Sequence, residues 1–150
     1  MGQDTTKPTI YSGTFERSMD AKNRVAIPSA WLAGEGEEFF VTPHSTEAYL
    51  TVMPPEEFQR MEQQIKSLAV PADVKAKMSR LFFGKSRQVS TDKQGRVLLP
   101  DDHCLEKGLK GEVVFIGTGS RFEIWSKANR EEATVSEAEI CRRMAEEIGL

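Results

Sequence analysis

The sequence predicts an α+β domain built from two related halves that together complete one core. A short signature occurs twice: residues 20–28 read DAKNRVAIP and residues 92–100 read DKQGRVLLP, so D-x-x-x-R-V-x-x-P returns after 72 positions. The same elements follow each copy, namely two apolar stretches with a polar loop between them and then a helix start. Internal repetition indicates repeated architecture, and two copies in 150 residues favour pseudo-two-fold pairing of half-domains over a long solenoid.

The strands are predicted from alternation and from short apolar runs. The first strand leads into a turn at residues 20–23, and the next one ends at Pro28, a residue suited to the first turn of a helix. The second half repeats this pattern around Pro100. The expected strands are 9–18, 25–27, 39–42 and 49–53 in the first half, and 97–99, 113–116 and 122–125 in the second.

Helices are expected between the halves and at the end of the chain. Residues 55–82 carry an amphipathic stripe that Pro71 divides into two helices. A closing helix over 126–148 begins near Ser126, with a restart at Thr134 or Ser136. The first stripe consists of Phe58, Met61, Ile65 and Leu68, which we expect to pack within the same chain.

Composition narrows the class of protein. No apolar run approaches the length of a membrane span, and residues 1–9 lack the apolar core of a secretory signal and are expected to be disordered. Two cysteines form no disulfide framework and suit a reducing cytosol. Net charge is −3, yet residues 75–100 hold seven basic residues and one acidic, whereas 35–62 hold seven glutamates and one arginine. A local positive surface favours binding of a polyanion. The solvated face of a helix accounts equally well for some of these basic residues.

No catalytic or metal site is predicted. The run Asp101-Asp102-His103-Cys104 brings carboxylates, an imidazole and a thiol together in sequence. Carboxylates after Pro100 complement a helix dipole, and consecutive helical residues do not face one site. The chain has no zinc-ligand spacing and no phosphate loop. We therefore expect no enzyme activity, no cofactor and no small-molecule substrate.

The repeated turn carries the functional signal. Asn23 and Gly95 occupy equivalent places, and both residue types tolerate a positive φ. An arginine can form two hydrogen bonds to a phosphate or to guanine, whereas the aspartate four residues earlier would repel phosphate. That aspartate is expected to accept backbone N–H bonds or to orient the arginine. Two readings stay open: a cationic loop that meets a duplex, or a closed Asp–Arg pair that only stabilises the turn.

These residues resemble the MraZ family of bacterial transcriptional regulators. The similarity rests on Tyr11-x-Gly13, both D-x-x-x-R signatures, Arg80-Leu-Phe-Phe-Gly84 and Phe122-Glu-Ile-Trp125, and it covers about residues 10 to 130. The resemblance implies a double-split, swapped-hairpin β-barrel of the AbrB type made by one chain, with half-repeats at about 10–57 and 83–130 joined by helices at 55–82 and followed by a C-terminal helix at 131–150. This chain departs from the family pattern at Gln94, where lysine is common, at Asn23, where glycine is usual, and in about ten extra N-terminal residues.

The resemblance also implies a function. Family members assemble into homo-oligomeric rings and bind repeats in double-stranded promoter DNA of the division and cell-wall gene cluster, chiefly as repressors, in the cytoplasm and associated with the nucleoid. Asp20, Asn23, Asp92 and Gly95 would organise the turns. The alternative is a protein-interaction or scaffold module of the AbrB-like antitoxin type without DNA contact. The expected DNA-binding residues are Arg24, Arg96, Lys22, Lys93, Arg17 and Arg87.

Overall fold

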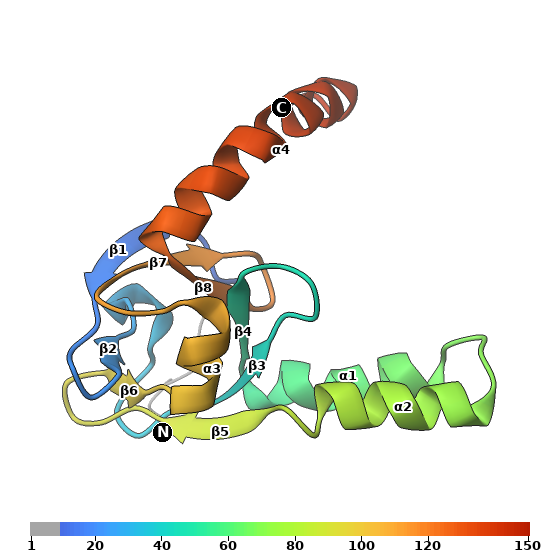
Figure 1. Cartoon of the computed structure of the whole chain (residues 1–150), viewed down its shortest axis with the longest axis horizontal. Helices are drawn as coiled ribbons and strands as arrows, with labels where there is room; N and C mark the ends of the chain where they lie inside the picture. Colours follow the sequence, from blue (N-terminus) through green and yellow to red (C-terminus); the bar gives the residue numbers. More distant parts are fainter. Residues whose placement is uncertain (1–9) are drawn as a thin grey trace, which may run out of the picture.

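A computed structural model describes residues 10–150, and the predicted disorder of residues 1–9 lies outside the described residues. A body of strands and one short helix carries two projections: the paired helices α1 (Pro55–Lys66) and α2 (Ala72–Phe82), and the long helix α4 (Lys127–Glu147) (Figure 1). The two projections leave the body in different directions. No helix of residues 10–150 is long and apolar enough to span a bilayer.

The main sheet is antiparallel and joins the two halves by exchange. Its six strands run in the order β1-β7-β8-β4-β3-β5. The first strand of each half pairs with the third strand of the other half, β1 with β7 and β5 with β3, while β4 pairs with β8 at the centre. The strands are β1 (Thr14–Ser18), β3 (Glu38–Pro43), β4 (Tyr49–Met53), β5 (Arg87–Ser90), β7 (Glu112–Gly117) and β8 (Phe122–Ser126).

This topology confirms an α+β fold of two tandem halves, whereas the closed barrel is not confirmed. Among the described residues β1 and β5 are the ends of the sheet, and no ladder joins them. Strand β5 was not predicted. The internal repeat could have indicated it, because β5 precedes the second turn as β1 precedes the first. The strand predicted from residue 9 begins only at Thr14, and Tyr11 forms a single bridge to Gly119.

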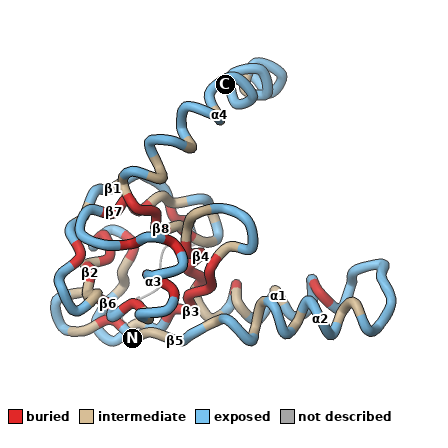
Figure 2. Tube along the Cα trace, viewed as in Figure 1, coloured by how far each residue is buried: buried red, intermediate tan, exposed pale blue. Residues whose placement is uncertain are grey.

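A two-stranded ribbon forms a second layer. Strands β2 (Arg24–Ala26) and β6 (Arg96–Leu98) pair antiparallel, with Val25 opposite Val97. Those two valines are 1% and 2% exposed and belong to the common core. The buried segments gather between the ribbon and the main sheet, and the two projections are mostly exposed (Figure 2). The ribbon therefore has one face on the core and one face outward.

Aromatic rings from both halves fill this core. Trp31, in the 3-10 helix η1 (Ser29–Trp31), lies 4.7 Å from the Phe122 ring and 5.7 Å from the Tyr11 ring, measured between ring centroids. Its indole N–H donates to the Ser12 carbonyl at 2.9 Å. A buried indole N–H needs such a partner. Because these contacts link residues from the two repeats, the halves share one core.

The paired helices are attached to the sheet by an aromatic stack and an ion cluster. Phe58 of α1 stacks on Phe40 of β3 with 4.0 Å between ring centroids, and Ile65 is buried. This confirms intramolecular packing for most of the predicted stripe, although Leu68 is 40% exposed. Glu57 accepts hydrogen bonds from Arg60, Ser120 and Arg121, the last two from the β7–β8 turn.

The short helix α3 (Asp101–Lys107) and the closing helix α4 follow local rules. Gly108 ends α3 in the left-handed conformation, with φ of 66°. The Ser126 hydroxyl caps α4 by accepting the Asn129 N–H at 3.1 Å. The predicted restart at Thr134 or Ser136 is wrong because both hydroxyls donate to carbonyls of the preceding turn, at 2.8 and 2.9 Å. A hydroxyl used in this way does not cap a new helix.

Candidate nucleic-acid interface

The first signature folds into a closed turn organised by Asp20. Its Oδ1 atom accepts the backbone N–H groups of Lys22 and Arg24, both at 2.9 Å, and its Oδ2 atom accepts the Arg24 Nε–H at 2.8 Å. Asn23 holds φ of 65°, the left-handed conformation predicted for it. The aspartate therefore performs both predicted tasks, accepting across the turn and orienting the arginine.

The second signature repeats this geometry. Asp92 Oδ1 accepts the N–H groups of Gln94 and Arg96 at 2.9 Å, and Oδ2 accepts the Arg96 Nε–H at 3.0 Å. Gly95 holds φ of 76°, equivalent to Asn23. Each turn carries one aspartate, one arginine and one lysine, so both have a net charge of +1. The sequence repeat is thus a structural repeat at atomic detail.

Both carboxyl groups are held in the charged form. The N–H of Arg24 is the main cause that lowers the pKa of Asp20 below its usual 3.8, with further contributions from the Arg24 side chain and the Lys22 N–H. The N–H of Arg96 acts in the same way on the pKa of Asp92. At neutral pH each aspartate is therefore a charged acceptor for the Nε–H group of its arginine.

The ribbon places the two arginines on one surface. Arg24 lies opposite Leu98, and Arg96 lies opposite Ala26. Because side chains alternate along a strand, these four residues share the face opposite to Val25 and Val97, which are in the core. Arg24 and Arg96 are diagonal neighbours, separated by roughly 7–8 Å in such ladders. Their side chains are 39% and 34% exposed, so neither is locked away.

The two arginines differ in how many nitrogens are engaged. Arg96 Nη2 donates to the Gln94 side-chain oxygen at 2.9 Å. In the first turn, Lys22 occupies the position equivalent to Gln94. Within residues 10–150 the terminal nitrogens of Arg24 make no hydrogen bond. Gln94 therefore distinguishes the second turn from the first, because it engages one donor of Arg96.

Each turn is held by the opposite half. The Leu99 N–H donates to the Asn23 carbonyl at 2.9 Å, and the Ile27 N–H donates to the Gly95 carbonyl at 3.0 Å. The Asn23 side chain also donates to Asp101 at the start of α3. Since these partners lie 68 to 78 positions apart, repeat pairing is required to present both loops.

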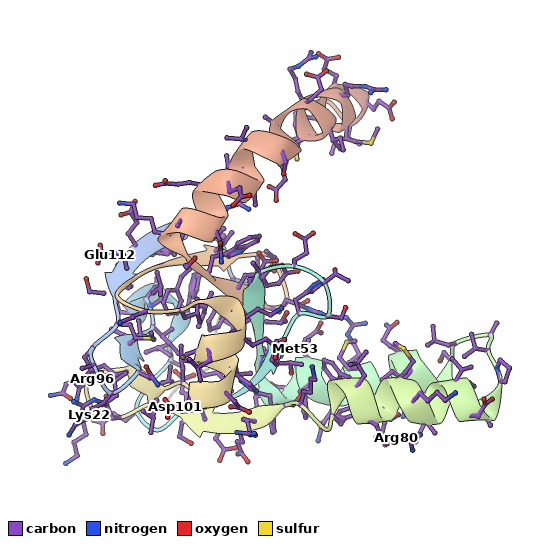
Figure 3. The ribbon with its side chains drawn as sticks, viewed as in Figure 1. Lys22, Met53, Arg80, Arg96, Asp101 and Glu112 are labelled. Carbon is purple, nitrogen blue, oxygen red and sulfur yellow. The ribbon has the colours of Figure 1, made fainter. Side chains whose placement is uncertain are left out.

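The remaining predicted cations lie in different surroundings. Lys22 and Lys93 are exposed at the turns, and Figure 3 shows Lys22 and Arg96 at the edge of the body remote from the paired helices. Arg17 donates to the Glu16 carbonyl at 2.9 Å and lies over the Phe15 ring. Arg87 pairs with Asp102 at 2.9 Å, which balances its charge. The structure therefore brings Arg24, Arg96 and the two lysines to the turns, and gives the other two arginines separate partners.

Sequence reasoning missed two residues of this surface. Leu98 is 60% exposed on the outer face of the ribbon, directly opposite Arg24. Its exposure could have been predicted from alternation, because a residue between the two core residues Val97 and Leu99 of a strand faces outward. Asp101 was interpreted only as a helix-start carboxylate, and no local pattern indicates its contact with Asn23.

The His103–Cys104 pair forms no site. His103 Nε2 lies 2.8 Å from the Lys85 carbonyl, and Cys104 belongs to the core. Burial raises the pKa of the Cys104 thiol to about 11, so the thiol stays neutral and a poor nucleophile. Among residues 10–150 no group of three or more histidine, cysteine or acidic side chains is placed to hold a metal ion.

The fold and the two turns define the class of this protein. It is a duplicated α+β domain that presents two arginine-bearing turns on one surface. The sequence model of the family described as "MraZ protein, putative antitoxin-like" matches twice, at residues 10–81 and 82–145. The chain therefore belongs to the MraZ family, which confirms the resemblance and both repeats. This family is one of transcriptional regulators and not of enzymes, as the names of similar curated proteins show.

Three relatives named "Transcriptional regulator MraZ" show how far the similarity extends. The protein of Carboxydothermus hydrogenoformans is 39% identical over 79% of this chain and 82% of its own length. That of Acetivibrio thermocellus is 34% identical over 94% of this chain and 98% of its own. That of Clostridium tetani is 31% identical over 91% and 98%, respectively. The similarity thus extends over nearly whole chains.

Proposed function

We propose that this transcriptional regulator binds double-stranded promoter DNA through the outer face of the β2–β6 ribbon. The observation that carries the proposal is that Arg24 and Arg96, 72 positions apart in sequence, lie diagonally on one exposed face. A closed Asp–Arg pair that served only the turn would not require this shared orientation. The family name supports regulation, and the geometry supports a nucleic-acid contact.

The dimensions of the ribbon suit a DNA groove. The major groove of B-DNA is about 12 Å wide and admits a two-stranded β-ribbon. A separation of roughly 7–8 Å between diagonal residues corresponds to about two base steps of 3.4 Å. Two arginines so placed would address bases, or phosphates, two steps apart. Lys22 and Lys93 at the flanking turns would neutralise phosphates, with Arg17 and Arg87 as more distant contributors.

One subunit offers few contacts, so assembly is part of the proposal. We infer a homo-oligomeric ring in which several ribbons engage spaced repeats, because linked weak sites gain affinity through effective concentration. Exposed apolar side chains on both projections are available for contacts between copies, among them Leu81, Ile140 and Met144. The single domain at 10–130 with its C-terminal helix, and the swapped-hairpin barrel, stay predictions within this proposal.

The genomic role follows the family. We propose repression of the division and cell-wall gene cluster, exerted in the cytoplasm on the nucleoid. The DNA upstream of the chain's own gene cluster is therefore the first duplex to use. A regulator that occupies its own promoter lowers transcription when it excludes polymerase, so a reporter fused to that promoter should become more active when the gene is deleted.

The test is a mobility-shift titration at two salt concentrations. Wild-type protein should bind the promoter duplex more weakly at 200 mM than at 50 mM salt, because each neutralised phosphate releases counterions. Arg24→Ala should abolish the shift while size-exclusion chromatography shows an intact oligomer. Arg143→Ala is a matched control, since it removes an exposed arginine of α4, away from the ribbon.

A scaffold of the antitoxin type would give a different result. Its binding to the duplex would be absent or independent of salt, and Arg24→Ala would leave every measured property unchanged. If the wild-type protein binds the duplex and Arg24→Ala binds it with the same affinity, the ribbon is not the surface that contacts DNA. These two outcomes separate a wrong function from a wrong site.

A further inference from the structure

The outer face of the ribbon contains an apolar side chain that the fold does not require. Leu98 is 60% exposed, while its neighbours Val97 and Leu99 are 2% and 1% exposed and fill the core. Strand alternation assigns Leu98 to the solvent side, where strands usually carry polar residues. Nothing in the core depends on its length.

This side chain is a neighbour of both arginines, and its symmetric counterpart is a smaller residue. Leu98 lies directly opposite Arg24 in the ladder, and the equivalent position opposite Arg96 is Ala26. The pseudo-two-fold axis between Val25 and Val97 therefore relates Leu98 to Ala26. One end of the face presents an arginine beside a long apolar group, and the other presents an arginine beside a methyl group.

We propose that Leu98 is a specificity-determining residue that contacts the 5-methyl group of a thymine next to the base addressed by Arg24. This inference rests on the proposed DNA contact of the ribbon. The major-groove edge of thymine carries the only apolar group among the four bases, and side chains without polar atoms recognise it. An exposed leucine beside a guanidinium therefore suits a thymine next to a guanine, the base to which an arginine can donate two hydrogen bonds.

The asymmetry gives the recognised element a direction. The leucine side chain extends two bonds beyond the Cβ atom at which the symmetric alanine ends, so only the Arg24 end makes a close methyl contact. A repeat read by this ribbon is then non-palindromic, with a methyl-sensitive thymine at one end.

The experiment removes single methyl groups from the DNA. A duplex with one copy of the preferred element, selected from random-sequence DNA by the full-length protein, is remade with uracil in place of each thymine in turn. Anisotropy titrations compare wild-type protein with Leu98→Ala. At one thymine, uracil should weaken wild-type binding about fourfold, the worth of one buried methyl group, and should leave Leu98→Ala unaffected.

Two further variants make the result decisive. Leu98→Met keeps the apolar reach and should keep the methyl sensitivity, while Ala26→Leu should create a second sensitive thymine at the other end of the element. If no thymine distinguishes wild type from Leu98→Ala, the inference is overturned, even where loss of binding by Arg24→Ala upholds the ribbon as the DNA contact. If the wild-type protein selects no duplex at all, both proposals are overturned.

Discussion

Arg24 and Arg96 are predicted to contribute unequally to DNA affinity, and Gln94 is the reason. Both arginines give Nε to an aspartate, at 2.8 and 3.0 Å. Arg96 also gives Nη2 to Gln94 at 2.9 Å, whereas both terminal nitrogens of Arg24 lack a partner within the described chain. A forked contact to guanine requires two donors of one guanidinium. Arg24 offers all of its terminal N–H groups for this fork, whereas Gln94 holds one Nη2–H group of Arg96, and that hydrogen bond is lost when Arg96 turns toward a base.

The size of the difference follows from that single hydrogen bond. Its net worth in a partly exposed place is about 1 kcal/mol, which corresponds to about fivefold in affinity. Arg24→Ala should therefore weaken binding about fivefold more than Arg96→Ala does. In a Gln94→Ala background Arg96 is free, so the two arginine substitutions should cost the same.

The assay is an anisotropy titration of a duplex with one repeat, at one fixed salt concentration. One repeat is used because linked sites would multiply the difference. Light scattering confirms that wild type, Gln94→Ala and the four arginine variants have the same oligomeric state. Equal losses for both arginine variants with Gln94 present, or a difference that persists in Gln94→Ala, would refute this reasoning.

The remaining predictions concern the turns and the core. Because the pKa values of Asp20 and Asp92 lie below 3.8 in the folded chain, their stabilising contribution is complete above that value and is lost as pH falls through the folded pKa. The melting temperature of wild-type protein should therefore drop more steeply below about pH 4 than that of the Asp20→Asn/Asp92→Asn variant, and parallel curves would contradict this. Trp31→Ala should cost about 3–5 kcal/mol of the free energy of unfolding, since a buried aromatic shared by both halves leaves a cavity. Urea denaturation at fixed protein concentration measures it, and a loss below about 1 kcal/mol would show that the core closes around the gap.

Much of the local structure could be predicted because its causes lie within a few residues. Ser126 caps α4 and Gly108 ends α3 as their residue types indicate. Asn23 and Gly95 take positive φ because a tight turn requires it. The restart at Thr134 failed for an equally local reason, since a hydroxyl can bond backward as well as forward. Sequence does not decide between those two bonds.

Strand exchange is the part that pattern alone could not supply. Alternation tells which side of a strand is buried but names no partner, and β5 was missed because its four residues have little alternation of their own. The pairing of β1 with β7 and of β5 with β3 depends on the energy of the whole core. A closed barrel was expected from the family and is not confirmed by the ladders among residues 10–150.

In the candidate site, too, the local turns could be predicted from the sequence, whereas the long-range arrangement could not. The chain by itself determined two aspartate-organised turns with an arginine in each, because hydrogen bonds over four positions are set by local geometry. Only the tertiary structure decided that both arginines share a face, that Leu98 lies opposite Arg24, and that Asn23 is held by Asp101. Those relations join residues more than 70 positions apart, so they arise from burial of Val25 against Val97 and not from any property of the turns alone.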